Sequence, residues 1–398
     1  AASPLFNGNA FYADFKNKNG ELLFNASYDR NKWLLAAEAA DKAVEICEGS
    51  DRALITGSTG KKTDLLNVMA DVENSMFSRF TNEEYLLEWK YTNTFHKFTL
   101  PRLVGDDKNF DAQAVGCLSP SMKMVEMYYT ENGLPIDADI TWNYSNRYKL
   151  GSESSPEYEG VIPMNTSVVN LHLRREPRFY ASIAGDRMYW QRGTNTAQDD
   201  YNLLVEAHKG EVPWGTQYDF IISNSWQNIN GYWLKKHLFS WFQTLGYSNN
   251  LQGNETAAII RLAEVYLMQS EAWNEYLDQP DSRVYDPIDK VRERAGILPV
   301  REAWGSYSNN PTKVTTKVGM REIIHQEYNI EFAFEGHRYW NLRRWLIAHQ
   351  ILNEKQYGWN VIGTTDQAFY NYETGPVVVW SSNKFVAPRD YLTPFDLR

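Results

Sequence analysis

The sequence predicts a mainly α-helical protein that carries long irregular loops and a few short strands. Three observations lead to this fold class. An amphipathic helix lies near the N-terminus, a helix-rich region covers residues 254–352, and between them residues 99–251 have apolar runs that Pro, Gly, Asn and Asp repeatedly interrupt. A chain of 398 residues can form one large domain or two ordinary ones. Length alone leaves both possibilities open.

The N-terminal part contains one clear amphipathic helix and a shorter candidate. In "DRNKWLLAAEAADKAVEICE" (Asp29–Glu48), apolar and small side chains recur at helical spacing, with Asp29 near the N-cap. In "TNEEYLLEWKYT" (81–92), Thr81 followed three residues later by Glu84 has the form of a capping box. We therefore expect a second, short helix there.

The region 254–352 is expected to be helical throughout. The predicted helices cover residues 254–277, a segment around "YDPIDKVRERAGI" that ends at Gly296, residues 317–334 and residues 338–352. Antiparallel helix pairs with small residues at their contacts indicate tetratricopeptide-like hairpins, although the sequence contains no clean repeat of the usual period.

The irregular region 99–251 is where we expect a ligand to bind. Long loops in compact proteins are usually functional. The chain also contains 25 Tyr, 14 Trp and 18 Phe. Aromatic rings with a polar atom recur on surfaces that bind other molecules, including the flat faces of sugars. An aromatic-rich core is the alternative explanation for this composition.

Three loop segments hold the candidate ligand-binding residues. "AGDRMYWQRG" (Ala184–Gly193) contains an arginine and two rings between glycines, and "GEVPWGTQYDF" (Gly210–Phe220) presents a tryptophan between Pro and Gly. "SNSWQNINGYW" (Ser223–Trp233) adds a further tryptophan beside asparagines. The candidates are Arg187, Tyr189, Trp190, Trp214 and Trp226. For each ring taken singly, packing within the loop remains the alternative.

Several function classes are disfavoured by charge and by missing motifs. The net charge of −10 argues against a nucleic-acid partner. The sequence has no P-loop, GxGxxG, GxSxG or HExxH motif, so we expect no cofactor and no metal. The "DAD" at Asp137–Asp139 could ligate calcium but lacks the other ligands of an EF-hand loop.

The segment "EFAFEGHRYWNLRRW" (Glu331–Trp345) suggests an enzyme at first sight. Glu331 and Glu335 lie one helical turn apart, within the range of a retaining-glycosidase pair. Three arginines follow within a turn or two: Arg338, Arg343 and Arg344. Charge pairing explains the carboxylates more simply, so we expect a buried network that fixes helix packing. A glycoside hydrolase that uses both glutamates is the alternative.

The same segment contains a histidine and a glycine to which we assign structural roles. His337 has no metal-type spacing to another histidine, and we expect it to be packed and hydrogen-bonded. Gly336 is expected to interrupt the helix and to let Trp340, Leu342 and Trp345 enter a core.

Taken in order, these segments resemble a known family. "RLAEVYLMQSEAWNE" (Arg261–Glu275), "VRERAG" (Val291–Gly296) and "EFAFEGHRYWNLRRW" are similar to the C-terminal region of the SusD-like (RagB) outer-membrane nutrient-binding lipoproteins. The resemblance extends from residue 3 to residue 398 through "SPLFNG", "KWLLAAEAADKAV", "ENGLPID", "REPRFYASI" and "YLTPFDLR".

The resemblance implies a single SusD-like domain over residues 1–398. This domain would capture oligosaccharides and deliver them to a SusC-like TonB-dependent transporter, without catalysis. It also implies a lipid anchor at the outer-membrane surface. Family members begin with a lipoprotein signal, a lipidated Cys and further helices that this sequence does not contain, so we expect an N-terminally truncated member. Since some relatives capture oligopeptides, a peptide ligand is an alternative.

Cys117, Arg187 and Trp214 together resemble the site of a fructan (levan) binding member of the family. Cys117 lies in a Gly/Pro/Ser loop, far in sequence from Cys47. We expect two free thiols, although the sequence leaves a disulfide between them open.

Overall fold

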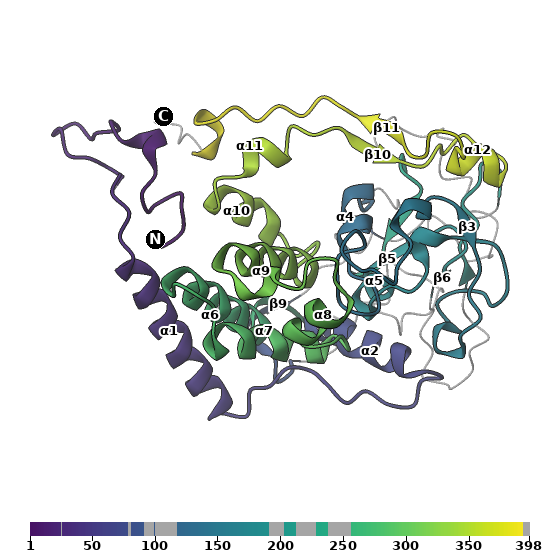
Figure 1. The fold of residues 1–398 in the computed structure, drawn as a ribbon, viewed down its shortest axis with the longest axis horizontal. Helices are drawn as coiled ribbons and strands as arrows, with labels where there is room; N and C mark the ends of the chain where they lie inside the picture. Colours follow the sequence, from purple (N-terminus) through teal and green to yellow (C-terminus); the bar gives the residue numbers. More distant parts are fainter. Residues whose placement is uncertain are drawn as a thin grey trace.

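A computed structural model describes residues 1–24, 26–78, 81–90, 99, 118–190, 203–211, 228–237 and 256–392. Two halves lie side by side in it (Figure 1). One half consists mainly of packed helices, and the other of helices, strands of two to four residues and turns around a hydrophobic core of its own. The predicted mainly α-helical fold class is confirmed.

The helical half is built on α1 and α6, which pack along each other. The small residues Ala37 and Ala40 are buried on α1 and allow this close approach, while Trp33 and Val44 fill the ends of the contact. Its helices are α1 (Asn31–Glu48), α6 (Leu262–Tyr276), α7 (Ser282–Arg294), α8 (Val300–Tyr307), α9 (Lys317–Glu331), α10 (His337–Arg344) and α11 (Ala348–Ile351). The predicted N-terminal helix and the helix before Gly296 are confirmed, and Gly296 has the positive φ of a C-terminal glycine, +71°.

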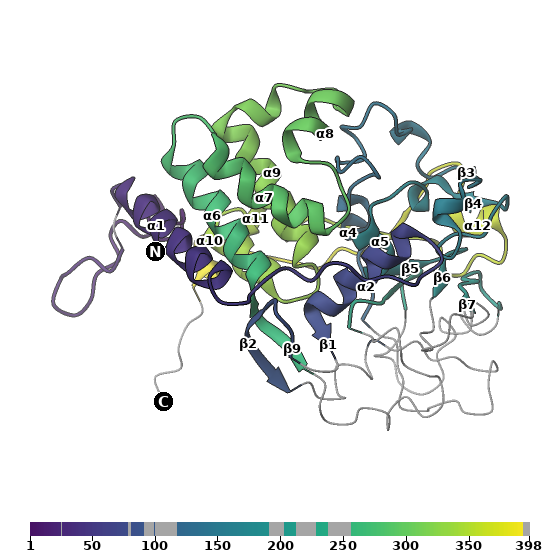
Figure 2. The same cartoon turned by 90° about the horizontal axis from the view of Figure 1, so that it is seen from below.

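Two predicted helical segments are strands. Residues 81–92 contain β2 (Tyr85–Lys90), and the start of the predicted helix at 254 is β9 (Thr256–Arg261). Both pair in an antiparallel sheet of order β1-β9-β2, in which β1 is Phe77–Ser78 (Figure 2). The capping box at Thr81 does not form, because the carboxylate of Glu84 instead pairs with Arg261 and Arg294 in the protein interior.

The predicted helix 338–352 is divided in two. Gly336, with φ of +87°, separates α9 from α10 as expected, and Leu346 at φ +59° then separates α10 from α11. Leu342 and Trp345 are buried as predicted. The prediction for Trp340 is wrong: its side chain, on α10, is 67% exposed and does not enter a core.

The second half is held together by buried aromatic side chains, among them Tyr128, Phe179, Tyr232, Trp233 and Trp359. Its helices are α2 (Asp64–Met76), α4 (Met122–Met127), α5 (Pro177–Ser182) and α12 (Asp366–Tyr370). Its strands are β3 (Leu150–Gly151), β4 (Val168–Val169), β5 (Ile183–Gly185), β6 (Tyr189–Trp190), β7 (Leu203–Leu204), β8 (Tyr232–Leu234), β10 (Gln356–Gly358) and β11 (Val377–Trp380).

The C-terminal segment connects the two halves a second time. After α11 the chain crosses to the second half, where β10, α12 and β11 lie, and then returns to the helical half (Figure 1). There Phe385 and Tyr391 pack with Leu5, Tyr12 and Leu342 in a small third core. Among the described residues, no helix is both long enough and apolar enough to cross a membrane.

Candidate functional site

Glu331 and Glu335, the pair that suggested a hydrolase, belong to a buried charge network between the two halves. Its side chains are at most 6% exposed. We call it the central network. Among the described residues it comprises five cations, Arg178, Lys236, Arg261, Arg292 and Arg294, and five carboxylates, Glu84, Glu176, Glu327, Glu331 and Glu335.

Arg261 lies at the centre of this network. Its Nη1 lies 2.9 Å from Glu84 Oε1 and 2.6 Å from Glu331 Oε1, and its Nη2 lies 2.9 Å from Glu335 Oε1. The ammonium of Lys236 lies 2.6 Å from the same Glu335 oxygen. Each carboxylate is thus shared by cations from different elements, which ties β9, α9 and the segment after β8 together.

The pKa values of the two glutamates do not suit glycoside hydrolysis. Burial raises the pKa of Glu335, but the charges of Arg261 and Lys236 outweigh burial and lower this pKa to about 2. The pKa of Glu331 is also held well below its usual range, because Arg294, Arg261 and Arg178 outweigh the effect of burial. A hydrolase needs one carboxyl group whose pKa is raised so that it can donate a proton. The pair therefore has the properties of a structural network.

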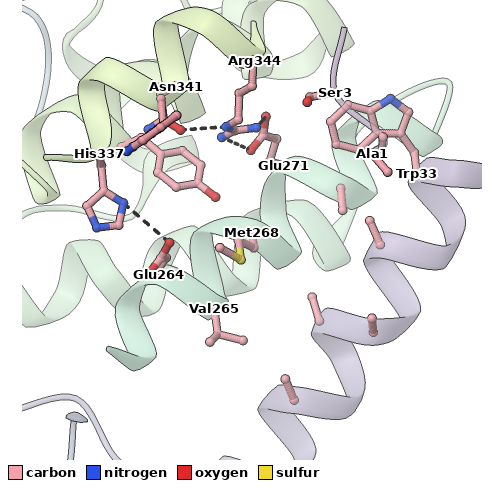
Figure 3. A pocket seen from close by; sticks show the side chains of 18 of the residues that line it. Ala1, Ser3, Trp33, Glu264, Val265, Met268, Glu271, His337, Asn341 and Arg344 are labelled. Carbon is pink, nitrogen blue, oxygen red and sulfur yellow. Dashed lines mark hydrogen bonds and ion pairs between the residues drawn. The ribbon is translucent and has the colours of Figure 1, made fainter. Parts of the chain in front are cut away.

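His337 faces a cavity of about 750 Å³ between α1, α6 and α10 (Figure 3). Its ring stacks on Phe332 with centroids 4.5 Å apart, which confirms the packing expected of it. Its Nδ1 lies 3.6 Å from Glu264 Oε1, which is an ion-pair distance and too long for the hydrogen bond that we expected. Burial raises the pKa of Glu264 to about 7.

The charged groups at the other end of this cavity pair with one another. Arg344 donates two hydrogen bonds to the carboxylate of Glu271, at 2.6 and 2.7 Å, and a third to Asn341 Oδ1 at 2.7 Å (Figure 3). Alanines of α1 and Val265 and Met268 of α6 line much of the rest. The cavity is therefore mainly apolar, and the groups of the enzyme-like segment that reach it are engaged in packing.

The predicted binding residue Arg187 lies in the turn between β5 and β6, at the centre of several carboxylates. Its Nη1 lies 3.2 Å from Glu206 Oε1, its Nη2 lies 2.8 Å from Glu211 Oε1, and its Nε lies 3.7 Å from Asp186 Oδ2. The side chain of Arg187 is 21% exposed, so its guanidinium is fixed in place while part of it faces solvent.

The other predicted residues divide into three groups. Tyr189, in β6, is half-buried, whereas Trp190, next to it, is 5% exposed and belongs to the hydrophobic core. Trp214, Trp226 and Cys117 lie outside the residues that the structure describes. Of the predicted set, Arg187 and Tyr189 are the described residues whose side chains are partly exposed.

A histidine that the sequence did not single out completes the surroundings of Arg187. His208 is 4% exposed, and its Nε2 lies 3.3 Å from Asp186 Oδ2 and 3.4 Å from Asp366 Oδ1. Its Nδ1 lies 3.7 Å from Glu211 Oε1. We call Asp186, Arg187, Glu206, His208, Glu211 and Asp366 the Arg187 cluster. Its members come from three distant segments, which is why no sequence spacing revealed it.

Two further candidates have local explanations. The carboxylate of Asp139 accepts hydrogen bonds from Thr130 Oγ1 at 2.6 Å, Asn132 Nδ2 at 3.0 Å and the Thr141 backbone N–H at 2.8 Å, so Asp139 organises its own loop, while Asp137 is exposed. Cys47 is a free thiol buried on α1, as expected of it.

The family comparison settles to which group of proteins the chain is related. A model of the SusD family (SusD_RagB) matches residues 76–395, which is most of the chain. The chain belongs to the SusD family. Among its relatives, SusD-like protein P25 of Formosa agariphila is 32% identical over 117 residues, which are 29% of this chain and 20% of that protein. SusD-like protein P2 of the same organism is 26% identical over 166 residues, 40% of this chain and 27% of that protein.

Solved structures of SusD-like proteins share the fold. BT4246 superposes with a TM-score of 0.76 at 23% identity, over 98% of this chain and 65% of that one. A SusD-like carbohydrate binding protein of Bacteroides fragilis (BF0978) gives a TM-score of 0.57 at 21% identity, over 91% of this chain and 59% of that one. This SusD-family chain thus spans less than two thirds of the length of these relatives.

Proposed function

We propose that this SusD-family protein captures oligosaccharides at the bacterial cell surface and delivers them to a SusC-like TonB-dependent transporter, without covalent chemistry. A lipid-anchored position at the outer membrane belongs to the same proposal. The observation that carries it is the family match over residues 76–395, which includes both the irregular region and the helical C-terminal region. That a SusD-like structural relative is described as carbohydrate binding supports the choice of ligand class.

The proposed binding surface lies at the Arg187 cluster and at the loops beside it. Arg187 is fixed by Glu206 and Glu211, and a fixed guanidinium loses little side-chain entropy when it donates hydrogen bonds to sugar hydroxyls. Glu206 and Asp366 have side chains 45% and 43% exposed and can accept hydrogen bonds from hydroxyls. Half-buried Tyr189, together with Trp214 and Trp226, would stack on the C–H faces of sugar rings.

Trp190 has a different part in this proposal. Because its ring is buried in the core, we propose that Trp190 anchors β6 to the core and does not contact the sugar. A fructan such as levan is the proposed ligand on the basis of Cys117, Arg187 and Trp214, which resemble the site of a fructan-binding member.

Screening the purified chain against an oligosaccharide array and a peptide panel tests the ligand class. We expect binding on the oligosaccharide array, with fructans among the ligands, and none on the peptide panel. Peptide binding without glycan binding would instead favour an oligopeptide-capturing relative. Release of shorter products from a polysaccharide, abolished in a folded Glu335→Gln variant, would contradict a purely binding role.

A further inference from the structure

We propose that Asp186, His208 and Asp366 form a binding site for a divalent transition-metal ion of the zinc type, with Glu211 on the other side of the imidazole. Asp186, His208 and Glu211 each offer one possible ligand atom, and these three atoms lie within 4.8 Å of one another. Asp186 follows β5, His208 and Glu211 lie in the segment after β7, and Asp366 begins α12. A metal here would connect three segments that are far apart in the sequence.

The strongest observation is the unsatisfied imidazole of His208. The side chain is 5% exposed, and its Nε2 is buried without a hydrogen-bond partner although two carboxylate oxygens lie 3.3 and 3.4 Å away. A buried polar atom left without a partner is costly. The Nε2 atom thus points between Asp186 and Asp366 without hydrogen-bonding to either.

The distances around Nε2 suit a metal better than a direct contact. Zinc binds imidazole nitrogen and carboxylate oxygen at about 2.0–2.2 Å in tetrahedral sites, which places two ligand atoms about 3.3–3.6 Å apart. The separations of Nε2 from Asp186 Oδ2 and from Asp366 Oδ1 are 3.3 and 3.4 Å. A nitrogen ligand beside carboxylates also favours zinc over calcium, which prefers oxygen ligands only.

The charges of the cluster point the same way. Among the described residues its four carboxylates, Asp186, Glu206, Glu211 and Asp366, face one arginine and one histidine. Arg187 pairs most closely with Glu211 and Glu206, at 2.8 and 3.2 Å, and is 3.7 Å from Asp186. A divalent cation beside His208 would offset the remaining negative charge of Asp186 and Asp366.

The surroundings of Asp186 would hold this ligand in place. The Tyr370 hydroxyl donates to Asp186 Oδ2 at 2.6 Å, and the Ala207 backbone N–H donates to Asp186 Oδ1 at 2.7 Å. Outer hydrogen bonds of this kind orient metal-binding carboxylates. On the other side of the imidazole, Glu211 lies nearest to Nδ1, at 3.7 Å, and also accepts a hydrogen bond from the His208 backbone N–H at 2.8 Å.

Calorimetric titration of the metal-stripped chain with ZnCl2, with CaCl2 and MgCl2 as comparisons, tests the proposal. We expect one Zn²⁺ per chain, a higher Tm in the presence of Zn²⁺, and neither effect with Ca²⁺ or Mg²⁺ at equal concentration. Both His208→Gln and Asp366→Asn should weaken Zn²⁺ binding by at least about tenfold. Glu373→Gln serves as the matched control, because Glu373 is an exposed carboxylate that follows α12 and lies outside the Arg187 cluster.

The titrations of the variants distinguish a specific zinc site from non-specific binding of zinc at the surface. Asp366 has a side chain 43% exposed, so its variant should fold even if the His208 variant does not. Absence of stoichiometric Zn²⁺ binding, or equal affinity in the wild type and Asp366→Asn, would overturn the proposal. The titration needs no glycan, so its failure would leave the proposed glycan binding unaffected.

Discussion

The central network and the Arg187 cluster both place arginine among several carboxylates, yet they differ in charge balance and in exposure. The central network pairs five cations with five carboxylates on side chains at most 6% exposed. In the Arg187 cluster four carboxylates face one arginine and one histidine, and the side chains of Glu206 and Asp366 are 45% and 43% exposed. Equal numbers of buried cations and carboxylates are typical of a structural network. An excess of partly exposed carboxylates is typical of a site that binds another molecule.

Burying the charges of the central network costs free energy, so the fold should be sensitive to the loss of any one of them. Transferring each ion out of water costs several kcal/mol, and mutual pairing repays that cost only when every partner is present. Because its members come from β9, α5, α7 and α9, the network fixes how the two halves of the molecule meet. The enzyme-like segment 331–345 contributes Glu331 and Glu335 to this network, whereas the paired cations come from other parts of the chain.

The largest effect is expected from Glu331→Gln. This change removes the one carboxylate that pairs with Arg178, Arg261 and Arg294 together, and we expect it to destabilise the fold by about 3–5 kcal/mol. Denaturant unfolding measures this loss. The control is Glu293→Gln, an exposed carboxylate on α7 that should change stability by less than about 0.5 kcal/mol. Equal effects in both variants would mean that the network contributes no special stability.

The decrease in the free energy of unfolding at acidic pH should depend on Glu335. Its pKa is about 2 in the folded protein, below the value near 4.3 of an unfolded chain. Its contribution, about 3 kcal/mol, is fully present above about pH 4.3 and is lost as the pH falls toward 2. Glu335→Gln should therefore lose less stability than the wild type across this window. Parallel curves from urea unfolding at successive pH values would contradict the assignment.

A small effect on stability is expected from Asp366→Asn in the Arg187 cluster. This change removes one of four carboxylates from a partly exposed group that has too few cations. In the absence of zinc we expect the free energy of unfolding to change by no more than about 0.5 kcal/mol. A loss comparable to that of Glu331→Gln, again from denaturant unfolding, would show that the two charge clusters do not differ as proposed.

Local sequence patterns predicted the elements that depend on local interactions. The spacing of Trp33, Ala37 and Val44 predicted α1, and Gly296 marked the end of α7. The strands β2 and β9 were missed because each is stabilised by a partner more than a hundred residues away, as in the pairing of Tyr85 with Arg261. For the same reason the apparent cap formed by Thr81 and Glu84 was misleading.

The candidate site was predictable only in part. Arg187 could be singled out because it lies between glycines in an aromatic loop, and its contact with a ligand stays a prediction. His208 and Asp366 could not be found, because their relation exists only after the segment following β7 meets α12. The burial of two tryptophans was also not predictable from the neighbouring sequence. Trp190 was predicted to contact ligand and is buried, whereas Trp340 was predicted to enter a core and is exposed.

The central claim is that the chain binds its ligand through the irregular region and not through the enzyme-like segment. Isothermal titration of an oligosaccharide selected from the array into Trp214→Ala and Trp340→Ala tests it with a matched pair of substitutions. Trp340, on α10, is 67% exposed, so its removal should not disturb the core. We expect Trp214→Ala to weaken binding at least about tenfold, the loss of about one sugar–ring stack, and Trp340→Ala to bind as the wild type does. Normal binding by Trp214→Ala with loss of binding in Trp340→Ala would contradict the account.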